Sequence, residues 1–319
     1  MNLSDLTDAL APLNLRSCLI HKQGHIIFQY EREPNISAHI AKINSCTKSI
    51  LSALVCIAME QRLLPEPDTE IVRFFPWLRD DTDERKRRIT LRHLLTMTAG
   101  FDWTEFGGQN SFPRMTRSAD WVRFALEQPL ADAPGARMTY NSGISQLLSS
   151  ILAQATGMSV AQFAEKHVFS PLGFRDYEWE YDPQGIHTGG FGLKLAPDDM
   201  LKFGLLYLQQ GVWQQRPLIN AELVRSSTQA AVAASAPDSG FYGWHWWADT
   251  LRASSALPTS PISEHAASYF YARGFGGQFI FVLPDQDTVV VFSREPRKKG
   301  PSALDIFRRR VAPLLVAGG

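Results

Sequence analysis

Apolar residues gather in short runs at both ends of the chain. Near the N-terminus, residues 15–22 and 25–32 form two such runs joined by Gln23-Gly24, a pattern that predicts a β-hairpin with a tight turn. Near the C-terminus, runs rich in Phe, Tyr, Val and Ile are separated by a Gly-Gly and a Pro-Asp pair. This punctuation predicts strands over 267–274, 278–283 and 288–294.

Between these ends the apolar residues follow a helical pattern. The segment from Ser45 to Gln61 is apolar almost all round and contains no Gly or Pro, which is typical of a helix buried on every side. Gly157 and Gly211 each follow another helical pattern, as helix-ending glycines do. The other helices we expect cover 91–98, 119–127, 145–155, 161–168, 198–209 and 302–316.

Strands at both ends with helices between them predict one antiparallel sheet built from both termini. Separate end domains are the weaker arrangement, because a lone two-stranded hairpin is at best marginally stable. We therefore expect an α/β (α+β) fold, in which helices flank this sheet and a mostly helical domain is inserted. The expected sheet domain is discontinuous, 1–44 and 190–319, and the expected inserted domain is 45–189, with the active site at their junction.

Composition and charge remove several classes of partner. The 319 residues are 45% hydrophobic and 20% charged, which are ordinary values for a globular protein. Lys plus Arg and Asp plus Glu both number 32, so no net charge attracts nucleic acid or an anionic membrane. We expect neither as a partner, and composition leaves the oligomeric state open.

The N-terminal residues and the cysteines predict a cytoplasmic location. Residues 1–10 carry Asp5 and Asp8 and lack the basic and apolar parts of a signal peptide, and no apolar stretch is long enough to span a bilayer. Cys46 and Cys56 fall in one predicted helix, where ten residues at ~1.5 Å each separate them by roughly 15 Å, too far for a disulfide. Neither the number nor the spacing of the cysteines predicts a zinc site.

The segment Ser45-Cys46-Thr47-Lys48 can carry nucleophilic chemistry. A serine hydroxyl needs a neighbouring base to attack a carbonyl, and Lys48 lies three residues on, on the same helix face. A lysine becomes a base where burial disfavours its ammonium form, and a helix N-terminus favours a developing oxyanion. The alternative is an N-cap serine followed by a surface lysine, but the apolar residues after Lys48 place it in a buried segment.

Two further segments are chemically suggestive. In Thr139 to Gly143, Tyr140 could share a proton with Lys48 and pass it to a leaving group; otherwise the tyrosine packs on a helix start that Ser142 and Gly143 cap. In Arg273 to Gln278, glycines between two strands let a substrate approach the backbone, where an N–H could be a second oxyanion donor. The alternative for this segment is a glycine-rich hairpin.

These three segments, in this order, resemble the motifs of serine β-lactamases and penicillin-binding proteins. Segments 89–103, 134–157, 171–174 and 189–213 are similar to the class C β-lactamase-related group, and within it to 6-aminohexanoate-dimer hydrolases and family VIII carboxylesterases. The resemblance implies a β-lactamase/transpeptidase-like fold and a serine hydrolase that needs no metal and no cofactor. It further implies roles for Ser45 as nucleophile, Lys48 as base, Tyr140 as second proton-transfer group, the N–H groups of Ser45 and Gln278 as oxyanion hole, and Ser142, Phe275, Gly276 and Gly277 as substrate-binding residues.

The chain departs from the β-lactamase pattern at two motifs. The usual Tyr-x-Asn ends here in Ser142, and the usual Lys-Thr-Gly is replaced by Phe275-Gly276-Gly277, without the lysine that helps to hold a β-lactam carboxylate. Arg273 could serve in its place. His187-Thr188-Gly189 imitates the third motif, but it precedes the helix at 198, and we interpret it as a decoy.

These departures favour small esters, or linear or cyclic amides, as substrates cleaved through an acyl-enzyme on Ser45. The alternatives are a true β-lactamase, a D-alanyl-D-alanine carboxypeptidase, or a catalytically inactive ligand-binding homologue. A Ser-His-Asp α/β-hydrolase is disfavoured because the chain has no Gly-x-Ser-x-Gly motif. Nine aromatic residues either pack in the core or line a pocket for an acyl chain or aromatic ester: Trp103, Phe106, Tyr242, Trp244, Trp246, Trp247, Tyr269, Tyr271 and Phe275.

Overall fold

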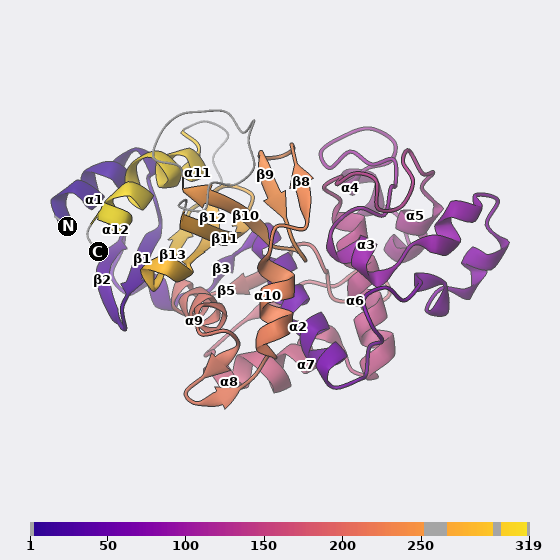
Figure 1. Ribbon diagram of the computed structural model, residues 1–319, viewed down its shortest axis with the longest axis horizontal. Coiled ribbons are helices and arrows are strands. Elements are labelled where there is room, and N and C mark those ends of the chain that lie inside the picture. Colours follow the sequence, from indigo (N-terminus) through magenta and orange to yellow (C-terminus); the bar gives the residue numbers. More distant parts are fainter. Residues whose placement is uncertain (1–2, 252–266, 296–300, 318–319) are drawn as a thin grey trace.

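The computed structural model describes residues 3–251, 267–295 and 301–317. Its main feature is an eight-stranded antiparallel sheet with the strand order β2-β1-β13-β12-β11-β10-β9-β8 (Figure 1). The N-terminal strands pair with the C-terminal ones along the edge of β13, so the expected sheet from both termini is confirmed. Its strands are β1 (Ser17–Lys22), β2 (His25–Glu31), β8 (Val232–Ala234), β9 (Gly240–Tyr242), β10 (Trp247–Leu251), β11 (Ala267–Gly274), β12 (Gln278–Leu283) and β13 (Thr288–Ser293).

Local sequence explains the two tight turns of this sheet. Gln23 and Gly24 join β1 to β2 with φ values of +49° and +83°, the positive values that a two-residue hairpin turn needs. Phe275, Gly276 and Gly277 join β11 to β12, and both glycines have positive φ. The hairpins predicted from the sequence are therefore present, whereas β8 to β10 were not predicted.

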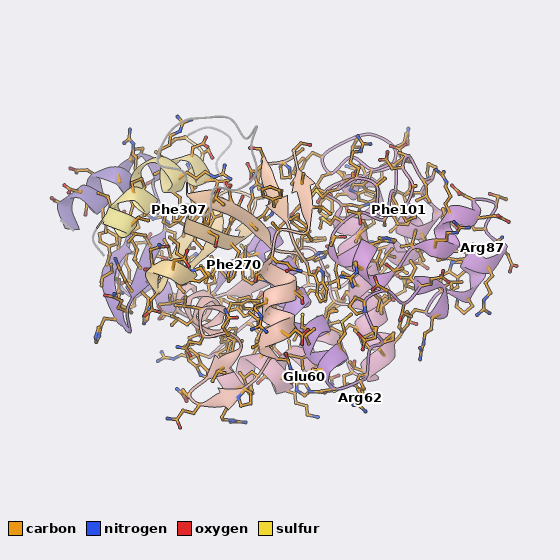
Figure 2. All side chains as sticks on the ribbon, viewed as in Figure 1. Glu60, Arg62, Arg87, Phe101, Phe270 and Phe307 are labelled. Carbon is orange, nitrogen blue, oxygen red and sulfur yellow. The ribbon has the colours of Figure 1, made fainter. Side chains whose placement is uncertain are left out.

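Each face of the sheet packs against its own helices. On β11, Tyr269 and Tyr271 pack with α1 (Leu3–Leu10) and the C-terminal helical segment, and the stacked rings of Phe281 and Phe307 lie in the same layer, 3.7 Å between centroids. Phe270 and Ala272 point the other way, into the larger core with α2 (Thr47–Glu60) and α9 (Pro197–Leu208). Figure 2 labels Phe307 and Phe270, one from each layer.

The middle of the chain forms the helical part, to the right in Figure 1. The predicted helices are present, with changed ends, and the α/β fold class is confirmed. The closing helix is three consecutive segments, α11 (Ala303–Ile306), a π-helical turn (Phe307–Val311) and α12 (Ala312–Ala317). The remaining helices are α3 (Leu91–Leu95), α4 (Phe112–Met115), α5 (Trp121–Glu127), α6 (Ser142–Thr156), α7 (Val160–Ala164), α8 (Ser170–Leu172) and α10 (Ala221–Thr228).

Two smaller sheets complete the fold. One is three-stranded, with β5 (Leu193–Leu195) between β3 (Ala41–Lys42) and β4 (Glu178–Trp179). The other pairs β6 (Val212–Trp213) with β7 (Arg216–Pro217). Within the described residues, every helix is too short or too polar to cross a bilayer.

Two of the changed helix starts lie at the expected site. Ser45 and Cys46 are not part of α2, because Asn44–Cys46 forms a separate 3-10 turn just before it. α6 begins at Ser142 rather than at 145, because the Asn141 side chain accepts the Ile144 N–H at 3.1 Å and acts as N-cap. The predicted domain boundaries stay a prediction, but the residues at both of them meet at this site.

Candidate active site

Ser45 lies in the 3-10 turn that leads into α2. Asn44 before it has a φ of +50°, a left-handed conformation that asparagine tolerates better than most residues. The Asn44 carbonyl accepts the Thr47 hydroxyl at 2.7 Å, and the Ile43 carbonyl accepts the Cys46 N–H at 3.2 Å. The 3-10 turn runs directly into α2, and the side chains of Ser45 and Lys48 still meet, with 3.5 Å between Oγ and Nζ.

Lys48 is buried at the site, and three polar groups surround its amine. Its side chain is buried, with 1% of the residue exposed. Its Nζ lies 2.9 Å from Ser142 Oγ, 2.9 Å from the Gly190 carbonyl oxygen and 3.5 Å from Ser45 Oγ. It also lies 4.8 Å from the centre of the Tyr140 ring. The structure therefore brings Ser45, Lys48 and Tyr140 together, as the sequence predicts.

Glu105 completes the polar contacts of Ser142 at the N-terminus of α6. The Ser142 hydroxyl donates to one carboxylate oxygen of Glu105. The other oxygen accepts the Ser142 N–H at 3.0 Å and the Trp103 indole N–H at 2.9 Å. A carboxylate at a helix N-terminus is favoured by the helix dipole. Ser142 is 2% exposed, and the two polar partners of its hydroxyl are Lys48 and Glu105.

Gly190 leaves room for the lysine. A Cβ atom on Gly190 would lie 2.9 Å from Lys48 Nζ and 3.1 Å from Ser142 Oγ, so a side chain there would displace one or both groups. Gly190 follows directly after the His187-Thr188-Gly189 segment that resembles the third motif. That segment is not on the strand where the third motif is expected, but the Gly190 carbonyl next to it accepts a hydrogen bond from Lys48.

His245 is a buried, neutral imidazole between the helices that carry Lys48 and Ser142. Its Nδ1 lies 2.9 Å from the Leu95 carbonyl, which can only accept, so Nδ1 carries the proton and Nε2 accepts from the Ser145 hydroxyl at 2.9 Å. Burial above all, with a smaller effect of the Lys48 charge, lowers the pKa of His245 to about 3, although the Leu95 bond acts in the opposite direction. Its own carbonyl accepts the Ser49 hydroxyl at 2.8 Å, so His245 links the helices that carry Lys48 and Ser142.

Tyr140 precedes the N-cap of α6 and is held by aromatic neighbours. Its ring stacks on Trp247, with 6.0 Å between centroids, and meets Tyr242 edge-on at 6.5 Å. Burial first, and then the nearby Tyr140 and Glu105, raise the pKa of the Tyr242 phenol well above its usual value. Tyr242 therefore stays protonated, and Tyr140 is the half-buried tyrosine beside Lys48.

The β11–β12 turn lies against the 3-10 turn Asn44–Cys46, which carries Ser45 and which we call the nucleophile turn. The Asn44 side chain donates to the Phe275 carbonyl at 2.7 Å, and the Gln278 carbonyl accepts the Cys46 thiol at 3.5 Å. A Cβ on Gly274 would lie 2.2 Å from the Ile43 carbonyl, which shows how closely the two segments approach. Gly274 and Phe275 thus lie against Ile43 and Asn44, the two residues before Ser45, while Arg273 pairs with Asp238. The oxyanion role of the Gln278 N–H stays a prediction.

His187, Cys18 and Cys56 lie outside this set of contacts, and Cys46 enters it only through the hydrogen bond of its thiol to the Gln278 carbonyl. The His187 ring packs edge-on against Trp179 and Tyr181. Cys18, Cys46 and Cys56 are buried free thiols, whose pKa values burial raises. In the part of the chain that the structure describes, no three His, Cys, Asp or Glu side chains converge as metal ligands.

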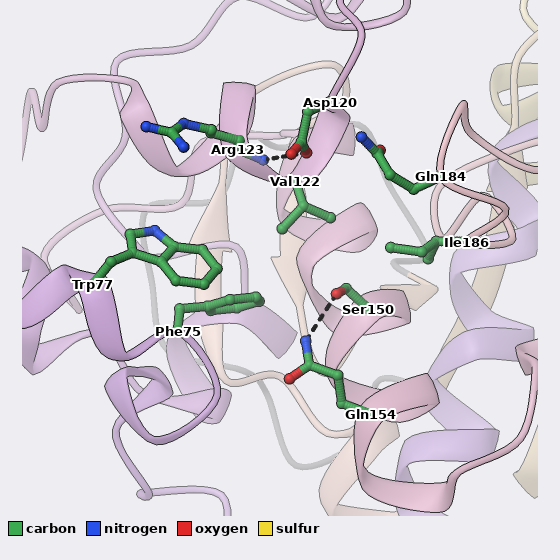
Figure 3. Close-up of a pocket in the computed structure, with 9 residues that line it drawn as sticks. All are labelled: Phe75, Trp77, Asp120, Val122, Arg123, Ser150, Gln154, Gln184 and Ile186. Carbon is green, nitrogen blue, oxygen red and sulfur yellow. Dashed lines mark hydrogen bonds between the residues drawn. The ribbon is translucent and has the colours of Figure 1, made fainter.

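A separate cavity of about 240 Å³ opens between α5, α6 and residues 75–77 (Figure 3). At its wall Gln154 donates to the Ser150 hydroxyl at 3.1 Å, and the Asp120 side chain accepts the Arg123 N–H at 2.9 Å. Ser150 is eight residues after Ser142 on α6, roughly 12 Å along the helix. None of the nine residues that line this cavity is a lysine or histidine that could activate Ser150. We therefore do not interpret this cavity as the active site.

Comparison with known proteins places these contacts in a family. The Beta-lactamase family model matches residues 31–310. The chain belongs to the Beta-lactamase family. It is 23% identical over 321 residues to a β-lactamase of Escherichia coli, with 86% of this chain and 80% of that protein covered. Family members and structural neighbours of this kind are serine hydrolases, so this chain is a hydrolase of the β-lactamase family.

Two further similarities bear on the branch of the family. Esterase EstB of Burkholderia gladioli is 30% identical over 149 residues, which span 42% of this chain but only 37% of EstB. A Bacillus anthracis protein assigned as a 6-aminohexanoate-dimer hydrolase has the same fold, with a TM-score of 0.79 at 17% identity, over 99% of this chain and 86% of that one. The proteins similar to this chain thus include an esterase and a 6-aminohexanoate-dimer hydrolase, the two kinds of enzyme that the sequence motifs resemble.

Sequence reasoning missed three residues of the site. Glu105 lies 37 positions before Ser142 in a loop, and nothing local marks it. Gly190 was available in the similar segment 189–213 but carries no side chain to signal a contact. His245 sits in an aromatic run that predicts core packing, and only the fold brings its imidazole to Ser145.

Proposed function

We propose that this protein hydrolyses small carboxylic esters, and small linear or cyclic amides, through an acyl-enzyme on Ser45. The observation that carries the proposal is the set of polar contacts around Lys48. The family and the fold support a serine hydrolase, and the esterase EstB is among the relatives. The roles given below to individual residues belong to the proposal.

The partners of the Lys48 amine determine to which of its contacts it donates and where its lone pair points. When the Lys48 amine is charged it has three donors, and Nζ donates to Ser45 Oγ; once it has given up a proton it has two N–H donors and one lone pair. The Gly190 carbonyl can only accept, and Ser142 Oγ must accept from Lys48 because its own proton goes to Glu105. Both N–H donors are then used, and the lone pair remains for the Ser45 hydroxyl at 3.5 Å. This distance is long for a hydrogen bond, and such bonds often tighten when substrate binds.

In acylation, the Lys48 amine takes the proton of Ser45 Oγ while Oγ bonds to the substrate carbonyl carbon. The carbonyl oxygen becomes an oxyanion, which the N–H groups of Ser45 and the β11–β12 turn would stabilise. The bond to the leaving alkoxide or amine then breaks, and Tyr140 and Lys48 return a proton to it. Water attacks the resulting ester by the same steps in reverse, with Tyr140 and Lys48 as the base.

Two features favour neutral esters and amides over β-lactams. Phe275 stands in the turn where the family pattern has a lysine for the β-lactam carboxylate. Arg273, the nearest cation in the sequence, is paired with Asp238. A hydrogen-bonded pair to that carboxylate contributes about 1.5–3 kcal/mol, so without it affinity falls about tenfold or more.

The test compares substrates on one preparation. We expect kcat/KM for p-nitrophenyl butyrate to exceed that for nitrocefin by at least about tenfold. A D-alanyl-D-alanine peptide and a short linear amide extend the comparison. Ser45→Ala is the matched control, since it removes one hydroxyl and should lose hydrolysis of every substrate. A preference for nitrocefin would instead support a β-lactamase.

A cytoplasmic location is part of the proposal. All three cysteines are buried free thiols in the structure, which agrees with a reducing compartment. Cell fractionation of a tagged chain tests this, and recovery outside the cytoplasmic fraction would contradict it.

A further inference from the structure

The nine aromatic residues near the site divide sharply by exposure. Seven are buried, with exposed fractions of 5% or less: Trp103, Tyr242, Trp244, Trp246, Trp247, Tyr269 and Tyr271. Phe106 and Phe275 are 71% and 58% exposed. Core packing explains the seven but not these two.

The two exposed rings come from segments far apart in the chain and lie against each other at a tilted angle. Phe106 follows Glu105, whose carboxylate contacts Ser142. Phe275 is in the β11–β12 turn, and its carbonyl accepts from Asn44, the neighbour of Ser45. The ring centroids are 6.3 Å apart, within the range of aromatic pairs. An apolar surface of two rings is therefore attached to both segments of the site: Phe106 directly follows Glu105, and Phe275 contacts Asn44 through its carbonyl.

The backbone around both rings is fixed by polar contacts rather than by ring burial. In the loop of Phe106, the Thr104 N–H donates to the Asn110 carbonyl at 2.9 Å, and Asn110 donates to the Asp102 side chain at 2.9 Å. Phe275 is held through its carbonyl by Asn44. The two phenyl rings are exposed to water, and the backbone that carries them is fixed. Binding of an apolar group over these rings removes apolar surface from water and is therefore favourable.

The charges next to the rings already have partners. Glu105 accepts hydrogen bonds from Ser142 and Trp103, and Arg273 forms an ion pair with Asp238. A charged substrate group placed between the rings would lose water without gaining a counter-ion. A neutral, apolar group fits this surface.

We propose that Phe106 and Phe275 bind the acyl chain of the substrate and select neutral, apolar acyl groups; this inference rests on the acyl-enzyme mechanism proposed above. The leaving group faces Tyr140, which packs on Trp247 and Tyr242. The aromatic pair is built from the loop after Glu105 and the turn beside Asn44, so the part of the substrate that stays on Ser45 reaches it.

The experiment measures kcat/KM for p-nitrophenyl acetate, butyrate, hexanoate and octanoate with wild type, Phe106→Ala, Phe275→Ala and the double variant. Each added methylene should raise the wild-type value about twofold to fourfold until the rings are covered. Each single variant should lose about tenfold on hexanoate and less than about twofold on acetate. The double variant should lose less than the product of the single losses, because the rings contact each other.

Trp77→Ala is the matched control, because Trp77 is 54% exposed and lies by the separate cavity of Figure 3. It should leave the chain-length dependence unchanged. Equal losses on acetate and hexanoate in the Phe variants would overturn the inference. A dependence on alcohol length in ethyl, butyl and hexyl acetates, with none on acyl length, would overturn the acyl assignment. Loss of acetate hydrolysis in Ser45→Ala tests the mechanism separately from the aromatic pair.

Discussion

Lys48 is 1% exposed and has three fixed polar neighbours, whereas Phe106 and Phe275 are 71% and 58% exposed and lie against each other. The first region, which we call the polar floor, consists of Lys48, Ser142, Glu105, Gly190 and His245. The second is the aromatic pair. Every hydrogen-bonding group of the floor that we describe has a partner, as buried polar groups require. The aromatic pair, in contrast, leaves apolar surface exposed to water. In the proposal, this contrast corresponds to reaction chemistry in the floor and substrate choice in the pair.

Loss of the base should have the largest effect and should not depend on the substrate. We expect Lys48→Ala to lower kcat/KM by about 10³-fold or more on acetate and hexanoate alike. Lys48→Arg should not restore activity, because a guanidinium does not give up its proton at working pH. Stopped-flow acylation rates check this, with circular dichroism as the control for folding. Substantial activity in the arginine variant would remove lysine from the role of base.

Gly190→Ala tests the position of the lysine without changing its chemistry. The new methyl group would lie 2.9 Å from Nζ, the flexible end of the Lys48 side chain, so the amine should move and the fold should remain. We expect kcat to fall about 10²-fold with little change in thermal stability. Comparable kcat values for variant and wild type would show that the Gly190 carbonyl does not position the base.

Glu105→Gln reverses the direction of one hydrogen bond in the floor. With the amide oxygen facing Trp103 and the Ser142 N–H, the amide NH₂ faces Ser142 Oγ and turns the hydroxyl proton toward Lys48. The lone pair of Lys48 is then occupied, so we expect kcat to fall about tenfold to 10²-fold with KM within about twofold. A change confined to KM would instead indicate that Glu105 contacts substrate.

His245 gives the floor a pH-dependent stability. Its pKa is about 3 when folded, below the ordinary value near 6.5, so the unfolded chain binds the extra proton between these pH values. The free energy of unfolding should therefore decrease as pH falls from 6.5 toward 3, by about 2 kcal/mol between pH 7 and pH 5. The His245→Asn variant should lack this contribution to the pH dependence of the free energy of unfolding. Asparagine tolerates the φ of +59° at this position. Urea titrations at both pH values measure it, and parallel losses in variant and wild type would contradict the assignment.

The sequence could predict the sheet and the nucleophile pair because their signals are local. Apolar runs with glycine and proline between them predict β11 to β13, and Ser45 and Lys48 lie three residues apart. The helical pattern predicts the start of α6 three residues late, because it does not mark Asn141 as the N-cap. Strands β8 and β9 have three residues each, too few for a pattern to show.

The contacts that orient the base could not be predicted, because they join segments far apart in the chain. Ser142 meets Glu105 across 37 residues and Lys48 across 94. The carbonyl of Gly190 acts through the backbone, which any residue has. The exposure of Phe106 and Phe275 also depends on the fold, since the neighbouring aromatic residues of similar composition are buried.

The central claim, an acyl-enzyme on Ser45, is tested most directly by mass spectrometry of the protein after reaction with a fluorophosphonate and, separately, after rapid acid quench with p-nitrophenyl butyrate. The account predicts one adduct in each reaction, the phosphonyl group (the reagent minus HF) or the butyryl group (the ester minus p-nitrophenol). Each should be located at Ser45 in the tryptic peptide of residues 43–48 and be missing in Ser45→Ala. An adduct on another residue, or wild-type ester hydrolysis by Ser45→Ala, would contradict it.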